Sequence, residues 1–235
     1  MTKTAVVTGA STGIGAALSN HLATDDWTVL ALARRTKMLE DLASQAQGKG
    51  KIVPITADLA TIEGVETAVN QVRGLTEHVD LVANIAGVWH DDENAYYGPT
   101  LWEMPESELI DVMTVGIMAP MLLTRGILPL MIGRDNAQIV NLSGTFSSGG
   151  AHWIHYFTSK RALEQFTVAL AAETKNEGIR VNCVSPADVA TEALIKFFSD
   201  DADSALSPAY VAEFIAHLGS PEMKHVNGQI IELRA

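Results

Sequence analysis

Short apolar runs recur along this sequence, and longer stretches with helical periodicity separate them. The runs are mostly rich in Val and Ile and do not alternate with polar residues: Thr4–Thr8, Thr28–Ala33, Ile52–Thr56, Leu81–Ala83, Gln138–Leu142, Arg180–Val184 and Gln229–Leu233. Strands of this kind are covered on both faces, as in a parallel sheet. Between them, apolar spacing predicts helices over Gly15–Thr24, Thr36–Ala46 and Arg161–Asn176. This alternation predicts an α/β fold with a single doubly wound parallel sheet and helices on both faces.

The sequence shows no internal repeat, low-complexity tract or linker rich in Pro and Gly. Residues 1–235 are therefore expected to form one domain. Two irregular segments, about 88–105 and 192–208, follow strands, and loops at the carboxyl ends of strands usually contact ligands. The first segment contains four aromatic residues, which either pack the loop or line a pocket for a bulky apolar or ring-shaped substrate: Trp89, Tyr96, Tyr97 and Trp102.

The charge and the cysteine content exclude several classes of function. With 16 Lys and Arg against 28 Asp and Glu, the formal net charge is −12, which disfavours binding to nucleic acid or to an anionic membrane. The single cysteine, Cys183, excludes an internal disulfide and a multi-cysteine metal site. The sequence starts without a signal-peptide pattern, and we find no apolar stretch of the roughly 20 residues that a membrane helix needs. These features predict a soluble, cytoplasmic protein.

Two acidic clusters raise the question of a metal site. The first cluster is consecutive and the second is nearly so: His90, Asp91, Asp92 and Glu93, and then Asp200, Asp201 and Asp203. Neighbouring side chains in a polar loop rarely converge on one ion. Solvated loops are therefore the better interpretation, and no metal is expected.

A glycine-rich turn, residues 8–15 with the sequence TGASTGIG, follows the first strand and opens the first helix. Glycine permits a tight turn and lets the backbone approach a pyrophosphate, while the helix N-terminus offers N–H groups and a favourable dipole to the anion. The strand before the turn and the helix after it favour a dinucleotide site over a plain turn. The predicted contacts are Gly9, Ser11, Thr12, Gly13, Ile14 and Gly15.

Further motifs follow this turn in a fixed order. They are Asp58-Leu59 after the third strand, Asn84-Ile85-Ala86-Gly87 after the fourth, Tyr156 with Lys160, Pro186 after the sixth strand, and Thr191. Together with the T-G-x-x-x-G-x-G spacing, they make the chain resemble the short-chain dehydrogenases/reductases over nearly its whole length. The resemblance implies a Rossmann-type sheet and an oxidoreductase.

The end of the second strand indicates which dinucleotide is bound. An NAD site needs a carboxylate there, but this strand ends in Ala33 and is followed by Arg34 and Arg35. Guanidinium groups bind a phosphate through paired donors, and cations are otherwise disfavoured at a helix start. The pattern therefore predicts a preference for NADP(H) over NAD(H).

The resemblance also implies the remaining cofactor contacts. Asp58, with Leu59, corresponds to the acid that contacts adenine, although an Asp after a strand can instead cap a helix. The resemblance places Asn84, Ala86 and Gly87 on the floor of the cofactor site. It places Pro186, Val189 and Thr191 near the nicotinamide.

A tyrosine and a lysine four residues apart, Tyr156 and Lys160, can share one face of a helix. Carbonyl reduction needs a proton donor, and a nearby ammonium group lowers the pKa of a phenol from its usual value of about 10. The resemblance implies that Tyr156 is the general acid/base and that Lys160 tunes it and holds the nicotinamide ribose.

The serine that binds the substrate oxygen in the family has two possible counterparts. The family pattern after the fifth strand has two serines, and Gly144 stands in the place of the second, which is catalytic. Counting back from Tyr156 at the usual spacing reaches Ser143 instead, which we take as the candidate. Ser147 and Ser148 are poorer substitutes.

A helix asparagine of the family is replaced by Gly116. In the family it holds a helix kink and a water that links the lysine to solvent. Glycine accepts the kinked backbone but offers no side-chain hydrogen bond, so a bound water is expected to fill the space.

The sequence thus predicts an NADP(H)-dependent enzyme that interconverts a small carbonyl compound and its alcohol. The alternative is a catalytically weak or silent NADP(H)-binding protein that acts as a sensor or assembly partner, because Gly116 and Gly144 remove polar groups from the site. The resemblance further implies a homodimer or homotetramer.

Overall fold

The computed structural model describes residues 2–146 and 149–234. Its strands follow the apolar runs closely: β1 Thr4–Thr8, β2 Thr28–Ala33, β3 Lys51–Thr56, β4 Leu81–Asn84, β5 Gln138–Leu142, β6 Arg180–Pro186 and β7 Ile230–Leu233. β1, β4, β5 and β6 are buried along their whole length, which explains why their sequences do not alternate. The predicted strands are confirmed to within a few residues at their ends.

The described residues form a seven-stranded sheet in the order β3-β2-β1-β4-β5-β6-β7, in which every pair is parallel. The chain runs outward from β1 to β3, returns to β4 beside β1, and then continues in the other direction. The strand order therefore reverses between β1 and β4, and ligands of such sheets bind at the carboxyl edge beside this point. The doubly wound Rossmann-type fold predicted from the sequence is confirmed.

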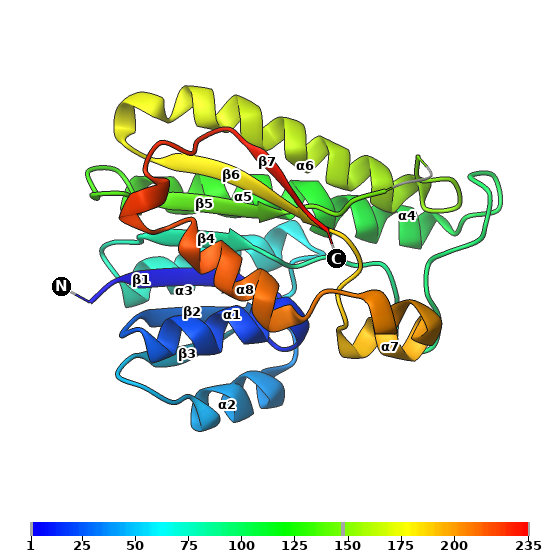
Figure 1. Ribbon diagram of the computed structural model, residues 1–235, viewed down its shortest axis with the longest axis horizontal. Helices are drawn as coiled ribbons and strands as arrows, with labels where there is room; N and C mark the ends of the chain where they lie inside the picture. Colours follow the sequence, from blue (N-terminus) through cyan, green and yellow to red (C-terminus); the bar gives the residue numbers. More distant parts are fainter. Residues whose placement is uncertain (1, 147–148, 235) are drawn as a thin grey trace.

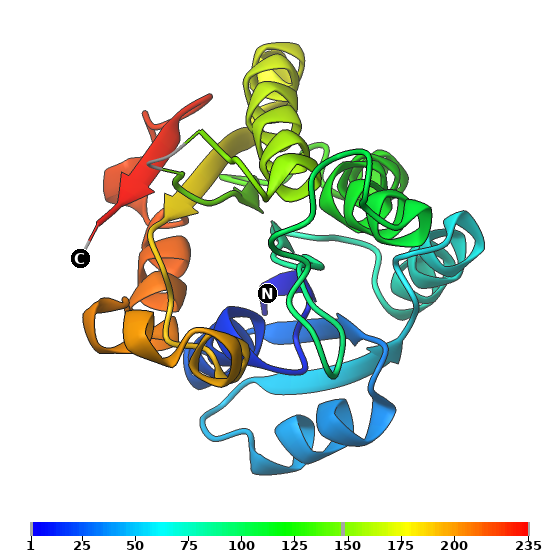
Figure 2. The same ribbon diagram turned by 90° about the vertical axis from the view of Figure 1, so that its right-hand side faces the viewer.

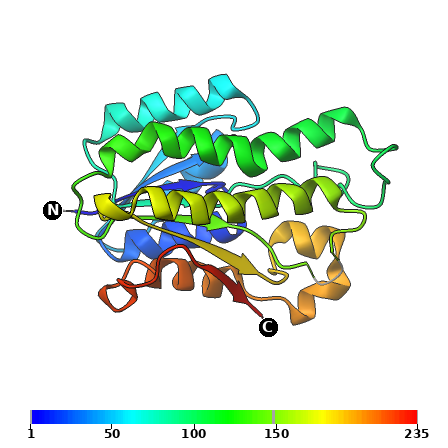
Figure 3. The same ribbon diagram turned by 90° about the horizontal axis from the view of Figure 1, so that it is seen from above.

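Helices cover both faces of the sheet (Figure 1). Their bounds are α1 Gly13–Thr24, α2 Thr36–Gln45, α3 Ile62–Leu75, α4 Glu106–Met113, α5 Ala119–Ile127, α6 Ile154–Glu173, α7 Glu192–Phe197 and α8 Pro208–His217. Apolar residues of α1, α2 and α8 form one core against the sheet, and those of α3, α5 and α6 form the other. Figure 3 shows α3, α5 and α6 side by side over the second face.

Two predicted segments differ from the structure. The helix expected to start at Arg161 begins at Ile154, so Tyr156 lies inside α6. The segment 192–208, expected to be an irregular loop, contains α7 and a 3₁₀ helix over Ser199–Ser204. Thr191 is the N-cap residue of α7, because its hydroxyl accepts a hydrogen bond from Leu194 N at 3.3 Å.

The carboxyl edge of the sheet carries the loop after β4, the start of α6, and α7, and Figure 2 views the molecule from this edge. We expected no apolar stretch long enough for a membrane helix, but the helical run Glu106–Leu130 has the length and composition of one. Half of its most apolar 18 residues are buried in the protein. It packs on α3 and α6, as core helices do. Length and composition alone are therefore weak grounds for assigning a membrane span here.

Candidate active site

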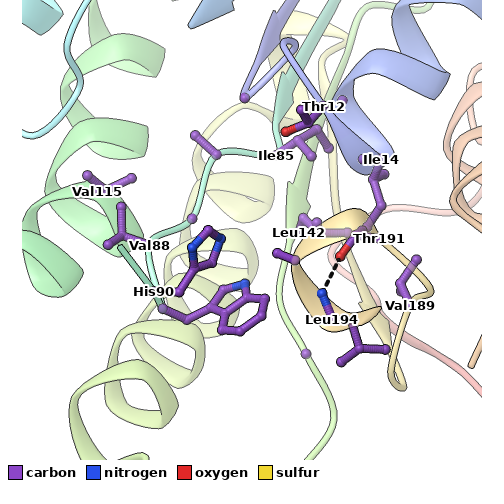
Figure 4. A pocket seen from close by; sticks show the side chains of 18 of the residues that line it. Thr12, Ile14, Ile85, Val88, His90, Val115, Leu142, Val189, Thr191 and Leu194 are labelled. Carbon is purple, nitrogen blue, oxygen red and sulfur yellow. Dashed lines mark hydrogen bonds between the residues drawn. The ribbon is translucent and has the colours of Figure 1, made fainter. Parts of the chain in front are cut away.

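A cavity of about 660 Å³ opens at the carboxyl edge, where the loops after β1, β4, β5 and β6 meet. Figure 4 labels Thr12, Ile85 and Thr191 on its wall. Nearly all of the predicted site residues line this one cavity: Gly9, Ser11, Thr12, Gly13, Ile14, Gly15, Arg34, Arg35, Asp58, Leu59, Ala86, Gly87, Ser143, Tyr156, Lys160, Pro186, Val189 and Thr191. The fold thus brings together groups from across the sequence.

Two glycines of the glycine-rich turn pack too tightly to carry a side chain. Gly9 has φ +66°, and a Cβ there would lie 3.0 Å from the Ala86 Cα. A Cβ on Gly15 would lie 2.3 Å from the Gly9 carbonyl oxygen. The first turn of α1 begins on this wall at Gly13 and Ile14, and the free N–H groups of a helix N-terminus attract an anion. The turn therefore fits a pyrophosphate.

Thr8 fixes the turn against the loop after β4. Its Oγ1 accepts hydrogen bonds from Ile85 N at 2.9 Å and from Ala86 N at 3.0 Å. Thr8 belongs to the glycine-rich motif, but the sequence alone did not predict a role for it. The hydroxyl joins two walls of the cavity and sets the distance between them.

Two arginines lie at the adenosine end of the predicted site. Both side chains are exposed on the cavity wall. Arg35 donates from Nη2 to Ser11 Oγ at 3.1 Å and to Thr12 Oγ1 at 3.0 Å, so it is positioned against the glycine-rich turn. Ala33, which is buried at the end of β2, leaves no carboxylate at this position. Such a site favours a ribose that carries a phosphate group over a ribose without one.

Asp58 lines the cavity and does not cap α3, and its predicted contact with adenine stays a prediction. Its Oδ1 accepts a hydrogen bond from Ala60 N at 3.0 Å. Thr61, rather than Asp58, is the N-cap residue of α3, because its hydroxyl accepts from Gly64 N. Asp58 therefore stabilises the turn before α3 while facing the cavity.

Asn84 lies away from the predicted cofactor floor. It is buried at the end of β4, and its Nδ2 donates to Asn141 Oδ1 at 2.8 Å and to Thr124 Oγ1 at 3.2 Å. Asn141 in turn donates to Thr167 Oγ1, which joins β4, β5, α5 and α6. Asn84 thus stabilises the sheet behind the cavity and is not among the lining residues, so its predicted contact with the cofactor stays a prediction.

Tyr156 and Lys160 lie one turn apart on α6 and both line the cavity. The Lys160 Nζ lies 5.3 Å from the centroid of the Tyr156 ring and donates to the Leu142 carbonyl at 2.7 Å. Burial lowers the pKa of Lys160 to about 8. Burial, together with the charge of Asp188, raises the pKa of the Tyr156 phenol above its usual value. This direction is opposite to the lowering expected from Lys160, and it keeps the phenol in its protonated form.

Ser143 lines the cavity, but its hydroxyl already donates a hydrogen bond to another side chain. Its Oγ donates to Glu164 Oε1 at 2.7 Å, and Glu164 is buried and paired with Arg161. Contact with a substrate oxygen would require exchange of this bond, so the predicted role of Ser143 stays a prediction. At Gly144, the nearest described atom to an added Cβ is Phe146 Cε2 at 3.8 Å, which leaves room for a serine. The candidates Ser147 and Ser148 lie outside the described residues.

Gly116 lies in a π-helical turn, Thr114–Met118, between α4 and α5. A Cβ at Gly116 would come within 2.6 Å of Ser159 Oγ, which itself donates to the Tyr156 carbonyl. The space beside the glycine is therefore filled by Ser159 and not open to the expected water. The wide turn and the missing side chain let α6 approach closely.

We expect Gly116→Ala to destabilise the protein by about 1–2 kcal/mol, because the added methyl group overpacks against Ser159. The matched control is Gly74→Ala in α3, where a Cβ meets no described atom within 4 Å. There the better helix propensity of alanine should stabilise by up to about 1 kcal/mol. Urea unfolding of both variants measures the difference, and equal stability of the two would contradict the packing argument.

The acidic loop after β4 is held by its own backbone. Asp91 Oδ1 accepts from Glu93 N at 2.7 Å and from Asn94 N at 2.6 Å, and these bonds lower the pKa of its carboxyl. Among residues 2–146 and 149–234, no three His, Cys, Asp or Glu side chains form a group able to hold a metal ion.

Two residues in or next to the cavity wall were not predicted from the sequence. Asp188 lines the cavity beyond Pro186, and Glu164 lies one turn after Lys160 on α6. Both could have been considered as candidates, because Asp188 follows Pro186 closely and Glu164 follows Lys160 by one helical turn. Which way their side chains point could not be read from spacing.

A doubly wound sheet whose glycine-rich turn shares one cavity with a tyrosine–lysine pair defines a dinucleotide-dependent oxidoreductase. The family model described as short chain dehydrogenase matches residues 3–202. The chain belongs to the short-chain dehydrogenase family, which confirms the resemblance seen in the sequence.

Three similar proteins are informative. A short chain dehydrogenase of Pseudocercospora fijiensis is 32% identical over 81% of this chain and 60% of its own. The 3-oxoacyl-(acyl-carrier-protein) reductase FabG of Thermotoga maritima is 29% identical over 97% of this chain and 95% of its own. A blue fluorescent protein from a metagenomic library, crystallised with NADPH, is 26% identical with a TM-score of 0.88, covering 99% of this chain and 96% of that chain.

Proposed function

We propose that the protein is an NADP(H)-dependent reductase that interconverts a small carbonyl compound and its alcohol, with Tyr156 as the general acid/base. The observation that carries this proposal is one shared cavity, which has two arginines near its glycine-rich turn and the Tyr156–Lys160 pair on its wall. The NADPH-bound structural neighbour supports the choice of cofactor.

Different residues of the cavity bind different parts of the dinucleotide. The glycine-rich turn and the start of α1 bind the pyrophosphate, and Arg34 and Arg35 bind the ribose phosphate. Val189 and Thr191 lie at the nicotinamide end, as the family resemblance implies. When bound, the cofactor supplies the hydride for reduction or accepts it in the reverse direction.

Tyr156 supplies the proton. In reduction, the phenol donates to the oxygen of the former carbonyl, and in oxidation the phenolate takes the alcohol proton. The raised pKa of Tyr156 keeps the phenol protonated near neutrality, which suits the reductive direction. Lys160 offers a nearby cation that stabilises the phenolate after proton transfer.

We expect Ser143→Ala to lower kcat by only about tenfold, because the Ser143 hydroxyl already donates its hydrogen bond to Glu164. The control is Ser185→Ala, which removes another buried hydroxyl from the neighbouring strand. Loss of a group that directly stabilises the reacting oxygen costs about 100- to 1000-fold. A loss of that size in Ser143→Ala would mean that Ser143 exchanges Glu164 for the substrate.

The proposal is tested with the purified protein, first by titration with NADPH and with NADH, followed by nicotinamide fluorescence. A panel of ketones and aldehydes is then screened for NADPH oxidation. Tight NADPH binding with no oxidation across the panel would instead support a silent NADP(H)-binding sensor or assembly protein. The retained tyrosine–lysine pair favours the enzyme.

We further propose that the protein works in the cytoplasm as a homodimer or homotetramer. Large apolar side chains are exposed on α4, α6 and the segment between α4 and α6: Ile110, Met118, Met121, Ile154 and Val168. Pairing of these helices with those of a second copy would cover them.

A further inference from the structure

Aromatic rings gather at the catalytic end of the cavity. Trp89 comes from the loop after β4, Trp153 precedes α6, and Phe198 follows α7, and all three line the cavity. Their ring centroids lie 6.0 to 6.2 Å apart, and Trp153 lies 5.8 Å from the ring of Tyr156. The rings therefore form a group beside the proton donor. The partly exposed faces of such rings attract cations as well as apolar groups.

Two exposed carboxylates, Asp188 and Asp201, line the same cavity, and Asp188 lies close enough to Tyr156 for its charge to raise the pKa of that phenol. Asp188 follows Pro186 at the end of β6, and Asp201 comes from the 3₁₀ helix after α7. The two segments are tied together, because Leu206 N donates to the Asp188 carbonyl at 2.8 Å and Val189 forms a β-bridge with Leu206. Within the part of the chain that the structure describes, neither carboxylate has a hydrogen bond or an ion pair.

The two lysines of the cavity wall, Lys160 and Lys196, donate hydrogen bonds to backbone carbonyls and not to these carboxylates. Lys160 donates to the Leu142 carbonyl, and Lys196 donates to the Asp92 carbonyl at 2.5 Å. The Lys196 Nζ also lies 5.0 Å from the centroid of Phe197, so a cation already rests on an aromatic face at this rim. Partial burial and the charge of Asp201 raise the pKa of the Asp188 carboxyl. A ligand cation would relieve this unfavourable charge.

We propose that the substrate carries a positively charged ammonium group, which binds between Asp188 and the ring group of Trp89, Trp153 and Phe198. This inference rests on the proposed reductase function and names its substrate class: amino ketones and the corresponding amino alcohols. Aromatic faces and a carboxylate are the groups that recognise such cations. The same charges disfavour phosphorylated or carboxylated substrates at this end of the cavity.

The test compares two ketones of the same shape, (3-oxobutyl)trimethylammonium and neutral 5,5-dimethylhexan-2-one. Each is titrated by calorimetry into the protein saturated with NADP⁺, a complex in which no reduction can occur. The readout is the ratio of the two Kd values, which needs no turnover. We expect the cation to bind about tenfold more tightly, as one partly exposed carboxylate and the rings would produce.

The ratio is then measured in Asp188→Asn and in Asp203→Asn. Asp203 lies on the 3₁₀ helix that carries Asp201 but outside the cavity wall, so its variant controls for the general loss of one charge. The proposal predicts that the ratio falls to about threefold in Asp188→Asn, the part that the rings still supply, and is unchanged in Asp203→Asn. A ratio near one in the unchanged protein, or the same ratio in both variants, would overturn it. NADPH oxidation with both ketones is followed in parallel, and its absence would count against the reductase function alone.

Discussion

Replacing Tyr156 by Phe is expected to lower kcat for carbonyl reduction by about 1000-fold while leaving the affinity for NADPH within about a factor of two. The change removes only the hydroxyl that donates the proton. The ring itself packs against Phe146 and Trp153, at centroid distances of 5.9 and 5.8 Å, and phenylalanine keeps these contacts. Steady-state kinetics with any substrate found in the panel, together with an NADPH titration, measures both quantities.

Tyr97→Phe is the matched control, because it makes the same chemical change in a ring that packs 5.2 Å from Trp153 but lies outside the cavity wall. Its kcat should stay within about twofold of that of the unchanged protein. If Tyr156→Phe retained full turnover, the proton would have to come from another group, and the proposed mechanism would be wrong. If both variants lost NADPH binding, the aromatic packing rather than the hydroxyl would be the cause.

The sheet could be predicted from the sequence because the burial of each strand is visible in its own residues. A strand buried on both faces must be apolar along its length, so β1, β2 and β5 were found with the bounds that the structure has. The start of α6 could not be found this way. Trp153 precedes it without the polar side chain of a usual N-cap, and the first turns carry cavity residues in place of a simple apolar stripe.

The backbone positions of the site could also be predicted, since glycine spacing and strand ends fix where a turn can approach a phosphate. The side-chain directions could not. Asn84 turns to Asn141, and Ser143 turns to Glu164, because these partners are brought near by packing of β5 and α6. Such long-range bonds satisfy buried polar groups, and a motif in the sequence does not record them.

Replacing both Arg34 and Arg35 by Ala is expected to weaken NADPH binding by about 100-fold, because hydrogen bonds to charged groups contribute about 1.5–3 kcal/mol each. NADH lacks the ribose phosphate, so its affinity should change much less. The readout is the ratio of the two dissociation constants from fluorescence titrations. Lys37→Ala is the control, because Lys37 is another cation of the α2 start but pairs with Asp41 at 2.7 Å.

The single variants separate the two arginines. Arg35 also holds the hydroxyls of Ser11 and Thr12, so Arg35→Ala should loosen the glycine-rich turn and weaken NADH binding as well as NADPH binding. Arg34→Ala should act on the phosphate alone and lower only the affinity for NADPH. An unchanged NADPH-to-NADH ratio in the double variant would mean that the phosphate of NADP(H) is bound elsewhere, and the cofactor proposal would then fail even if the chemistry of Tyr156 held.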